Sequence, residues 1–147
     1  MVTFDIFAVS PLELRLHRVE KIAYPISKVL AILTQPNLFI GILPCRSRKI
    51  TATKISAVES GQNFSIEFAD AVITGQFQLV DPDPAGGTIV LTWKEPTLEE
   101  STIIIEVNPT SDYETELLIS QNPFADRDTR ASFNEAWSES VQRLKKG

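Results

Sequence analysis

The sequence predicts an α+β fold in which a curved antiparallel sheet of about seven strands wraps around one long C-terminal helix. Two patterns carry this prediction. From residue 48 to residue 121, apolar and polar residues alternate with a period of two, interrupted by short turns rich in Pro, Gly and Asp. From residue 124 onward, the apolar residues follow a helical spacing instead. Consecutive strands with connections this short form an antiparallel meander.

The first elements precede this meander. Residues 12–22 alternate leucines with charged residues, which predicts a strand, and Tyr24 and Pro25 end it. Four apolar residues then recur at the i, i+3, i+4, i+7 spacing of an amphipathic helix, which ends before Pro36. They are Ile26, Val29, Leu30 and Leu33. Residues 36–44, bracketed by prolines, predict a second short helix or turn.

The alternating segments predict six further strands. These strands are expected at residues 49–59, 63–70, 71–81, 88–95, 101–109 and 113–121. In the hairpin around the Asp-Pro-Asp-Pro turn, Phe77 and Leu79 precede the turn and are expected on one face of their strand. Leu91 and Trp93 follow the turn and share one face of the next strand. Gly75 leaves room beside these large side chains.

One long helix is predicted over residues 124–147. Its apolar residues recur at i, i+4, i+8 and i+11, at Phe133, Trp137, Val141 and Leu144. Acidic residues at its start and lysines at its end match the helix dipole. A curved sheet must bury the apolar face of such a helix against its concave side. Because a helix held in a curved sheet rarely fills the whole concavity, we expect an internal cavity between the two.

Length and composition indicate one domain, which we place at residues 12–147, with residues 1–11 as an N-terminal tail or an extra strand. Apolar residues at 43% and charged residues at 22% are ordinary for a globular protein. A net charge of −5 argues against nucleic acid and anionic membranes as partners, since phosphate binding relies on clustered Lys and Arg. The basic clusters Arg46–Lys49 and Arg143–Lys146 are interpreted as solvated surface.

The single cysteine excludes an internal disulfide and favours a cytoplasmic location. The N-terminus lacks the basic region of a signal peptide. No apolar run approaches the ~20 residues of a transmembrane helix. We expect no cofactor and no metal site.

Four segments, taken in order, resemble the START-like (SRPBCC) superfamily with its helix-grip (START/Bet v-like) fold. Within it, the chain is most similar to the activator of heat-shock protein 90 ATPase homologue family. The segments are YPISKVLAILTQP (24–36), GQFQLVDPDPAGGTIVLTW (75–93), TIIIEVNPTSDYETELLISQNPF (102–124) and AWSESVQRLKK (136–146), and the resemblance covers about residues 12–146. Two departures stand out. FIGILPC (39–45) replaces a segment that is often Trp-rich, and Ala136 replaces a frequent Gly.

The resemblance implies a cavity that binds a small, mostly apolar molecule. Such proteins include carriers, cyclases, hydrolase-like proteins and co-chaperone domains, so the fold alone does not fix the function. We predict that apolar side chains from the inward strand faces and the last helix line the cavity. They are Phe64, Ile66, Phe68, Ile73, Phe77, Leu91, Trp93, Ile103, Ile105, Leu117, Ile119, Phe133 and Trp137. The expected partner is an unidentified small hydrophobic molecule, and a monomer and a homodimer both stay open.

Two alternatives remain. The first is a protein-binding module similar to a co-chaperone domain, for which NLFIGIL (37–43) is the candidate exposed apolar patch. The second is a cyclase or hydrolase that uses the same cavity, and it requires an inward-facing acid–base pair.

The sequence offers no clear acid–base pair. His17 falls on a strand face expected to be exposed, and Cys45 is expected to be a half-buried thiol without a base. Arg18 and Glu20 are interpreted as a charge pair near a strand end, and the other carboxylates fall on polar strand faces or in turns. We therefore predict a binding protein rather than an enzyme.

Overall fold

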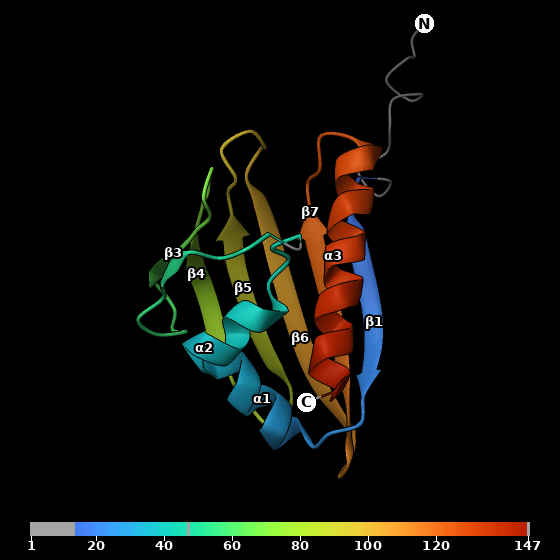
Figure 1. The fold of residues 1–147 in the computed structure, drawn as a ribbon. Helices are drawn as coiled ribbons and strands as arrows, with labels where there is room; N and C mark the ends of the chain where they lie inside the picture. Colours follow the sequence, from blue (N-terminus) through green and yellow to red (C-terminus); the bar gives the residue numbers. More distant parts are fainter. Residues whose placement is uncertain (1–13, 47, 147) are drawn as a thin grey trace, which may run out of the picture.

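A computed structural model describes residues 14–46 and 48–146 (Figure 1). Its strands are β1 (Leu16–Ile22), β2 (Ala52–Lys54), β3 (Asn63–Glu67), β4 (Val72–Asp81), β5 (Gly87–Trp93), β6 (Ser101–Ser111) and β7 (Glu114–Asn122). Its helices are α1 (Ile26–Thr34), α2 (Pro36–Phe39), the 3-10 turn η2 (Ile40–Ile42) and α3 (Arg127–Lys146). The predictions for residues 1–11 and for the first two residues of the 12–22 strand lie outside the described residues.

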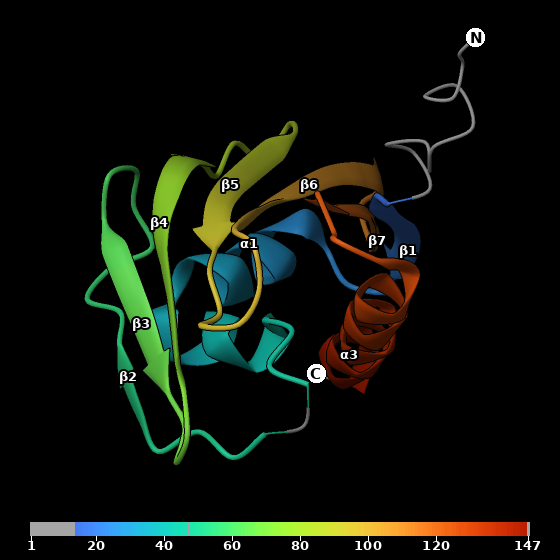
Figure 2. The same cartoon turned by 90° about the horizontal axis from the view of Figure 1, so that it is seen from above.

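All neighbouring strands are antiparallel, in the order β1-β7-β6-β5-β4-β3-β2. Strands β2 to β7 form the predicted meander, whereas β1 pairs with β7 and sets Leu16 opposite Gln121. Figure 2 shows the sheet curving around the helices, with α3 near the β1 end and α1 and α2 farther along the concave side. The predicted α+β fold, with two short helices after the first strand and a long C-terminal helix, is confirmed.

The ends of several elements differ from the prediction. Strand β1 begins at Leu16, so Leu14 and Arg15 lie outside it, and β3 ends at Glu67 rather than at residue 70. The strand expected at 49–59 shrinks to β2, whose three residues are all exposed, because this segment forms the edge of the sheet and buries no continuous face. The last helix begins at Arg127 rather than at residue 124. Asp126 precedes it and its Oδ1 accepts a hydrogen bond of 2.7 Å from the backbone N–H of Thr129, which is the geometry of an N-cap.

The predicted shared face of Phe77 and Leu79 is wrong. Phe77 is fully buried and Leu79 is 44% exposed. The pairing of β4 with β5 shifts register between these two residues, so that Phe77 lies opposite Leu91 and Leu79 opposite Val90. A bulge of this kind reverses which face a later side chain occupies. Leu79 is therefore excluded from the interior.

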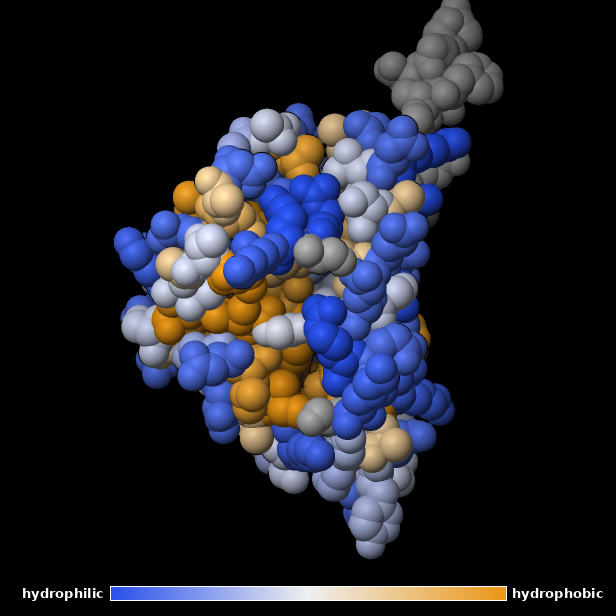
Figure 3. Space-filling view, viewed as in Figure 1, coloured by the Kyte–Doolittle hydropathy of each residue, from blue (hydrophilic) through white to orange (hydrophobic). Residues whose placement is uncertain are grey.

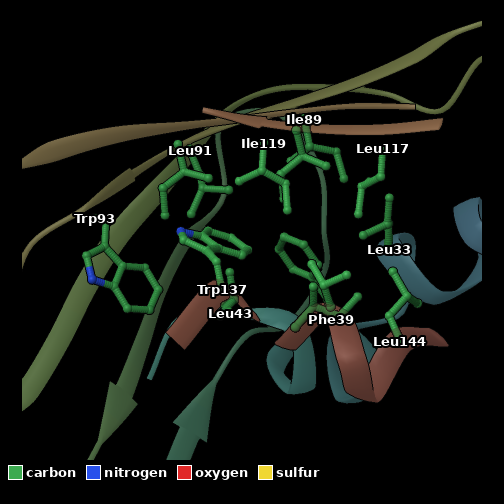
Figure 4. Close-up of a cluster of buried hydrophobic side chains, with 14 of the residues drawn as sticks. Leu33, Phe39, Leu43, Ile89, Leu91, Trp93, Leu117, Ile119, Trp137 and Leu144 are labelled. Carbon is green, nitrogen blue, oxygen red and sulfur yellow. The ribbon is translucent and has the colours of Figure 1, made fainter. Parts of the chain in front are cut away.

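The core lies between the concave face of the sheet and the helices. Figure 4 shows Leu91 and Ile119 pointing from the sheet towards Trp137 of α3. Gly75 is needed for this packing, because a Cβ atom there would lie 2.1 Å from the Thr92 carbonyl oxygen and 2.4 Å from Phe64 Cζ. The prediction that Gly75 makes room for large neighbours is confirmed.

Candidate functional site

The inward face of β5 continues beyond the end of the strand. Leu91, Trp93 and Glu95 alternate along the chain, and all three are at most 3% exposed. Backbone hydrogen bonds between Lys94 and Thr74, of 2.8 and 3.0 Å, keep the chain extended past Trp93. Because side chains alternate along an extended chain, the Glu95 carboxylate faces the interior beside the Trp93 ring.

Three donors converge on the Glu95 carboxylate. Trp93 Nε1–H donates to Oε2 over 3.0 Å, and Arg48 Nη2 donates to Oε1 over 3.2 Å. Arg46 Nη2 donates to the same Oε1. A carboxylate this deeply buried requires such compensation, because an unpaired charge in the interior costs several kcal/mol. With two guanidinium groups on one carboxylate, the cluster carries a net positive charge.

The two arginines come from the segment between η2 and β2, and aromatic rings hold them in place. The Arg46 guanidinium lies 4.8 Å from the centroid of Phe133, and that of Arg48 lies 4.4 Å from the centroid of Phe68. Their side chains are only 26% and 27% exposed, so the interpretation of Arg46–Lys49 as solvated surface is wrong for both. The reason is a tertiary contact, because the buried carboxylate of Glu95, far away in the sequence, binds both guanidinium groups.

A hollow of about 170 Å³ lies next to Glu95, between the sheet and the first turns of α3. We call it the mouth pocket. Its walls come from the end of β5, the β5–β6 loop, the start of β6, the β7–α3 connection and α3. The residues are Trp93, Glu95, Thr97, Leu98, Glu99, Ser101, Pro123, Phe124, Ala125, Asp126, Thr129 and Phe133. The buried walls are mainly aromatic, and a carboxylate and a hydroxyl interrupt them.

A buried polar chain leads from the mouth pocket into the core. Gln121 is fully buried, and its Nε2 donates to Ser101 Oγ over 2.9 Å. Its Oε1 accepts a hydrogen bond of 2.9 Å from Trp137 Nε1–H. Both tryptophans thus satisfy their N–H groups inside the protein, which buried indoles generally require. Ser101 connects this chain to the pocket wall.

All thirteen residues predicted to line a cavity are buried. They lie on or directly after β3 (Phe64, Ile66, Phe68), on β4 (Ile73, Phe77), β5 (Leu91, Trp93), β6 (Ile103, Ile105) and β7 (Leu117, Ile119), and on α3 (Phe133, Trp137). Trp93 and Phe133 also line the mouth pocket. Deeper inside, the ring of Phe64 lies 5.2 Å from that of Phe77 and 6.3 Å from that of Trp93. Packed aromatic rings therefore occupy much of the space behind the pocket.

Residues 37–43 do not form the predicted exposed patch. Phe39, Ile42 and Leu43 are at most 4% exposed, because α2 and η2 pack these side chains into the core. Leu38 points outward and is 47% exposed. It borders a groove of about 340 Å³ with Ile32 and Leu144.

His17 and Cys45, the two side chains considered as reactive groups, have contacts typical of structural residues. His17 is exposed, and its Nδ1 lies 3.0 Å from Ser120 Oγ. Burial raises the pKa of the Cys45 thiol to about 11, which keeps it protonated near neutral pH. Within residues 14–46 and 48–146, no group of three or more His, Cys, Asp or Glu side chains is arranged to hold a metal ion.

Arg18 and Glu20 form the predicted charge pair, with 2.7 Å between Arg18 Nη2 and Glu20 Oε2. Arg18 also donates to Ser138 Oγ over 2.8 Å, and Lys145 lies 3.2 Å from Glu20. Burial raises the pKa of Glu20, but the hydrogen bonds and charges of Arg18 and Lys145 outweigh it and lower that pKa overall. The pair therefore fastens β1 to α3.

The sequence patterns did not single out Glu95, Ser101 or Gln121 as site residues. For Glu95 a signal was present, since it follows Trp93 by two positions and a strand places such residues on one face. For Gln121 the same period applies, because Leu117, Ile119 and Gln121 share the inward face of β7. A polar residue in phase with a buried apolar face is informative, since burial without a partner is unfavourable.

Neither a family model nor a curated protein matches the chain. Solved structures do match it. Protein MLL2253 from Mesorhizobium loti is 21% identical, with a TM-score of 0.71 over 90% of this chain and 94% of that one. A START superfamily protein from Mycobacterium smegmatis is 10% identical, with a TM-score of 0.68 over 89% and 94% of the two chains. An HSP90 activator from Plasmodium falciparum is 19% identical, with a TM-score of 0.55 over 76% and 74%.

Similarity at these identities concerns the arrangement of the backbone. The three alignments cover between 76% and 90% of this chain, so the similarity extends over most of its fold. No helix in the described residues is both long and apolar enough to cross a membrane. The structural similarities and the order of the elements show that the protein has the START-like helix-grip fold.

Proposed function

We propose that residues 12–147 act as one domain that binds a small hydrophobic molecule between α3 and the curved sheet, entering through the mouth pocket. The observation that carries this proposal is the position of Trp93 and Phe133. Both side chains are at most 2% exposed, yet they form the wall of a hollow. Concave, mostly apolar walls with a few polar groups are the common form of a small-molecule site.

The size of the pocket limits the part of a ligand that fits without rearrangement. An apolar cavity of about 150 Å³ accepts benzene. The mouth pocket, at about 170 Å³, is therefore suited to a single ring or a short branched chain. A larger ligand would extend inwards along the remaining predicted lining residues, such as Phe64, Phe77 and Trp137, and would have to displace their packed side chains. Glu95 and Ser101 would orient a polar group of the ligand at the wall.

The proposal is tested by native mass spectrometry of freshly purified protein, followed by extraction and identification of small molecules. Toluene titrated into the chain, followed by NMR, then probes the pocket directly. Thr129→Phe would fill the pocket from its α3 wall. It keeps the backbone N–H that Asp126 accepts and removes the hydrogen bond of the Thr129 hydroxyl to Asp126. Gln142→Phe, at an exposed position of the same helix, is the matched control. We expect toluene shifts at Trp93 that Thr129→Phe abolishes and Gln142→Phe retains. Equal toluene shifts in both variants would refute the proposal.

Catalysis in the same pocket is a second candidate, favoured by the buried carboxylate of Glu95. A general base must reach its substrate with a free acceptor position. Both oxygens of Glu95 already accept hydrogen bonds, from Trp93, Arg46 and Arg48. This arrangement supports orientation of a bound molecule more than proton transfer. A ligand that is converted by the native chain but bound unchanged by Glu95→Gln would establish catalysis.

Protein binding, as in a co-chaperone, rests on the backbone similarity to an HSP90 activator. The apolar segment that would have supported it, residues 37–43, is largely buried. Ligand binding is therefore the stronger proposal.

A further inference from the structure

A second hollow, of about 290 Å³, is lined by Arg46, whose ion-pair partner Glu95 lines the mouth pocket. We call it the arginine pocket. Arg46, Arg48 and Arg143 line it, together with an apolar floor that includes Ile40, Leu43 and Ile50. Figure 3 shows the hydrophobic surface of this face beside the hydrophilic band that follows α3. The pocket thus joins guanidinium groups and aliphatic side chains in one concavity.

The charge of the arginine pocket is opposite to that of the whole chain. Three arginines face two carboxylates there, Glu95 behind the wall and Glu139 on the rim. The chain as a whole carries a net charge of −5. Positive charge gathered in a partly enclosed, low-dielectric concavity attracts anions more strongly than the same charge spread over a surface.

The hydrogen bonding of Arg46 is incomplete. Its Nε is buried and has no acceptor within the described part of the chain. Arg46 is also the one non-glycine residue described with a positive φ, 57°. A buried donor without an acceptor costs roughly 1–3 kcal/mol, and a left-handed non-glycine residue adds strain. Both features recur where a site is completed by a ligand.

Hydrogen bonds to backbone carbonyl oxygens fix the positions of the other two arginines, Arg143 and Arg48. Arg143 donates from Nε and Nη2 to the Gly41 carbonyl oxygen over 3.1 and 3.0 Å. Arg48 donates from Nε to the Cys45 carbonyl oxygen over 2.9 Å. These bonds fix the guanidinium planes at the pocket wall, and planar guanidinium groups match the two oxygens of a carboxylate.

We infer that the arginine pocket binds a small organic carboxylate, with its head at Arg46 and Arg143 and its aliphatic tail on the floor of Ile40, Leu43 and Ile50. This site is separate from the mouth pocket. Its occupant is an amphipathic anion, whereas the mouth pocket takes an uncharged apolar group.

The test uses sodium hexanoate as the probe, titrated into the full chain by isothermal calorimetry. Hexan-1-ol has the same tail without the charge, and inorganic phosphate has charge without a tail. We expect hexanoate to bind at least about tenfold more tightly than hexan-1-ol, since one charge-assisted hydrogen bond alone is worth that factor. We expect a similar advantage over phosphate, since burial of about two methylene groups of the tail is worth the same factor.

Variants assign the site. Arg143→Gln, at an exposed position, should weaken hexanoate about tenfold, and Arg46→Gln at least as much. Lys54→Gln removes the same charge from exposed β2 and should leave hexanoate binding unchanged. If Arg46→Gln does not fold, Arg143→Gln still decides the question. Thr129→Phe, which fills the mouth pocket, should also leave hexanoate binding unchanged. The proposal for the arginine pocket and the proposal for the mouth pocket are therefore tested separately.

Three results would overturn the inference. One is the absence of measurable hexanoate binding to the native chain. Another is equal hexanoate affinity in the Arg143→Gln, Arg46→Gln and Lys54→Gln variants. The third is phosphate or hexan-1-ol binding as tightly as hexanoate, because the pocket would then recognise charge alone or apolar surface alone.

Discussion

Replacing Glu95 with Gln tests whether the buried ion cluster holds the mouth of the fold together. The substitution keeps the shape of the side chain and removes its charge. The side chain, 3% exposed, then no longer compensates the charges of Arg46 and Arg48. With the amide oxygen towards the arginines, the amide NH₂ faces another donor, Trp93 Nε1–H. Removing one partner of a buried ion pair costs roughly 3–5 kcal/mol. Because the arginine side chains keep 26% and 27% exposure and can regain water, we expect about 3 kcal/mol.

Urea denaturation followed by tryptophan fluorescence measures this loss. A slope near 2 kcal/mol/M converts about 3 kcal/mol into a midpoint lower by about 1.5 M urea. Glu100→Gln, the same chemical change at an exposed position of the β5–β6 loop, is the control and should stay within about 0.5 kcal/mol of the native chain. Arg48→Gln combined with Glu95→Gln should cost less than the sum of the single changes by about 1 kcal/mol or more. If Glu95→Gln denatures at the same urea concentration as Glu100→Gln, the cluster does not stabilise the fold.

Two further predictions concern close packing and thiol chemistry. Gly75→Ala should lower the unfolding free energy by about 1–3 kcal/mol, because its Cβ would lie 2.4 Å from Phe64 Cζ. Gly41→Ala, with no atom within 4 Å of the new Cβ, should remain within about 0.5 kcal/mol of the native chain. Urea denaturation measures both variants. At pH 8, iodoacetamide should alkylate Cys45 in the native chain about a hundredfold more slowly than in urea, since burial raises the thiol pKa from 9.0 to about 11. A native alkylation rate that levels off near pH 9 would contradict that assignment.

Local periodicity was sufficient to predict the architecture. The alternation of apolar and polar residues identified the strands of the meander. The spacing of four apolar residues identified α3, and all four are buried: Phe133, Trp137, Val141 and Leu144. These patterns succeed because burial repeats every two residues on a strand and every three to four on a helix. The alternation pattern placed Leu79 on the wrong face of the sheet. Register is a property of two paired strands, and the bulge after Phe77 depends on how β5 aligns with β4.

The polar part of the site depends on contacts between distant segments. Arg46 and Glu95 lie 49 positions apart, and neither neighbourhood alone indicates that the two meet. Composition placed Arg46 and Arg48 on the surface, since charged side chains are usually exposed. Only the folded sheet brings them over Phe133 and Phe68, where the rings and the carboxylate together hold them. The burial of Glu95 could have been predicted, because Glu95 lies two residues after Trp93 on the same strand face. Its contacts with Arg46 and Arg48 could not.

The pairing of β1 with β7 has a consequence for the order in which the protein folds. The first described strand finds its partner about a hundred residues later, and closing a loop of that length costs about 4 kcal/mol of chain entropy. The helix that follows it, α1, packs against β6 and β7, which are equally late in the chain. During synthesis β2 to β5 can pair as soon as they emerge, whereas the N-terminal strand and its helix must wait for β7. Late docking of the N-terminal segment against a preformed meander is therefore built into the topology, and it places slow, non-local pairing at the final step of folding.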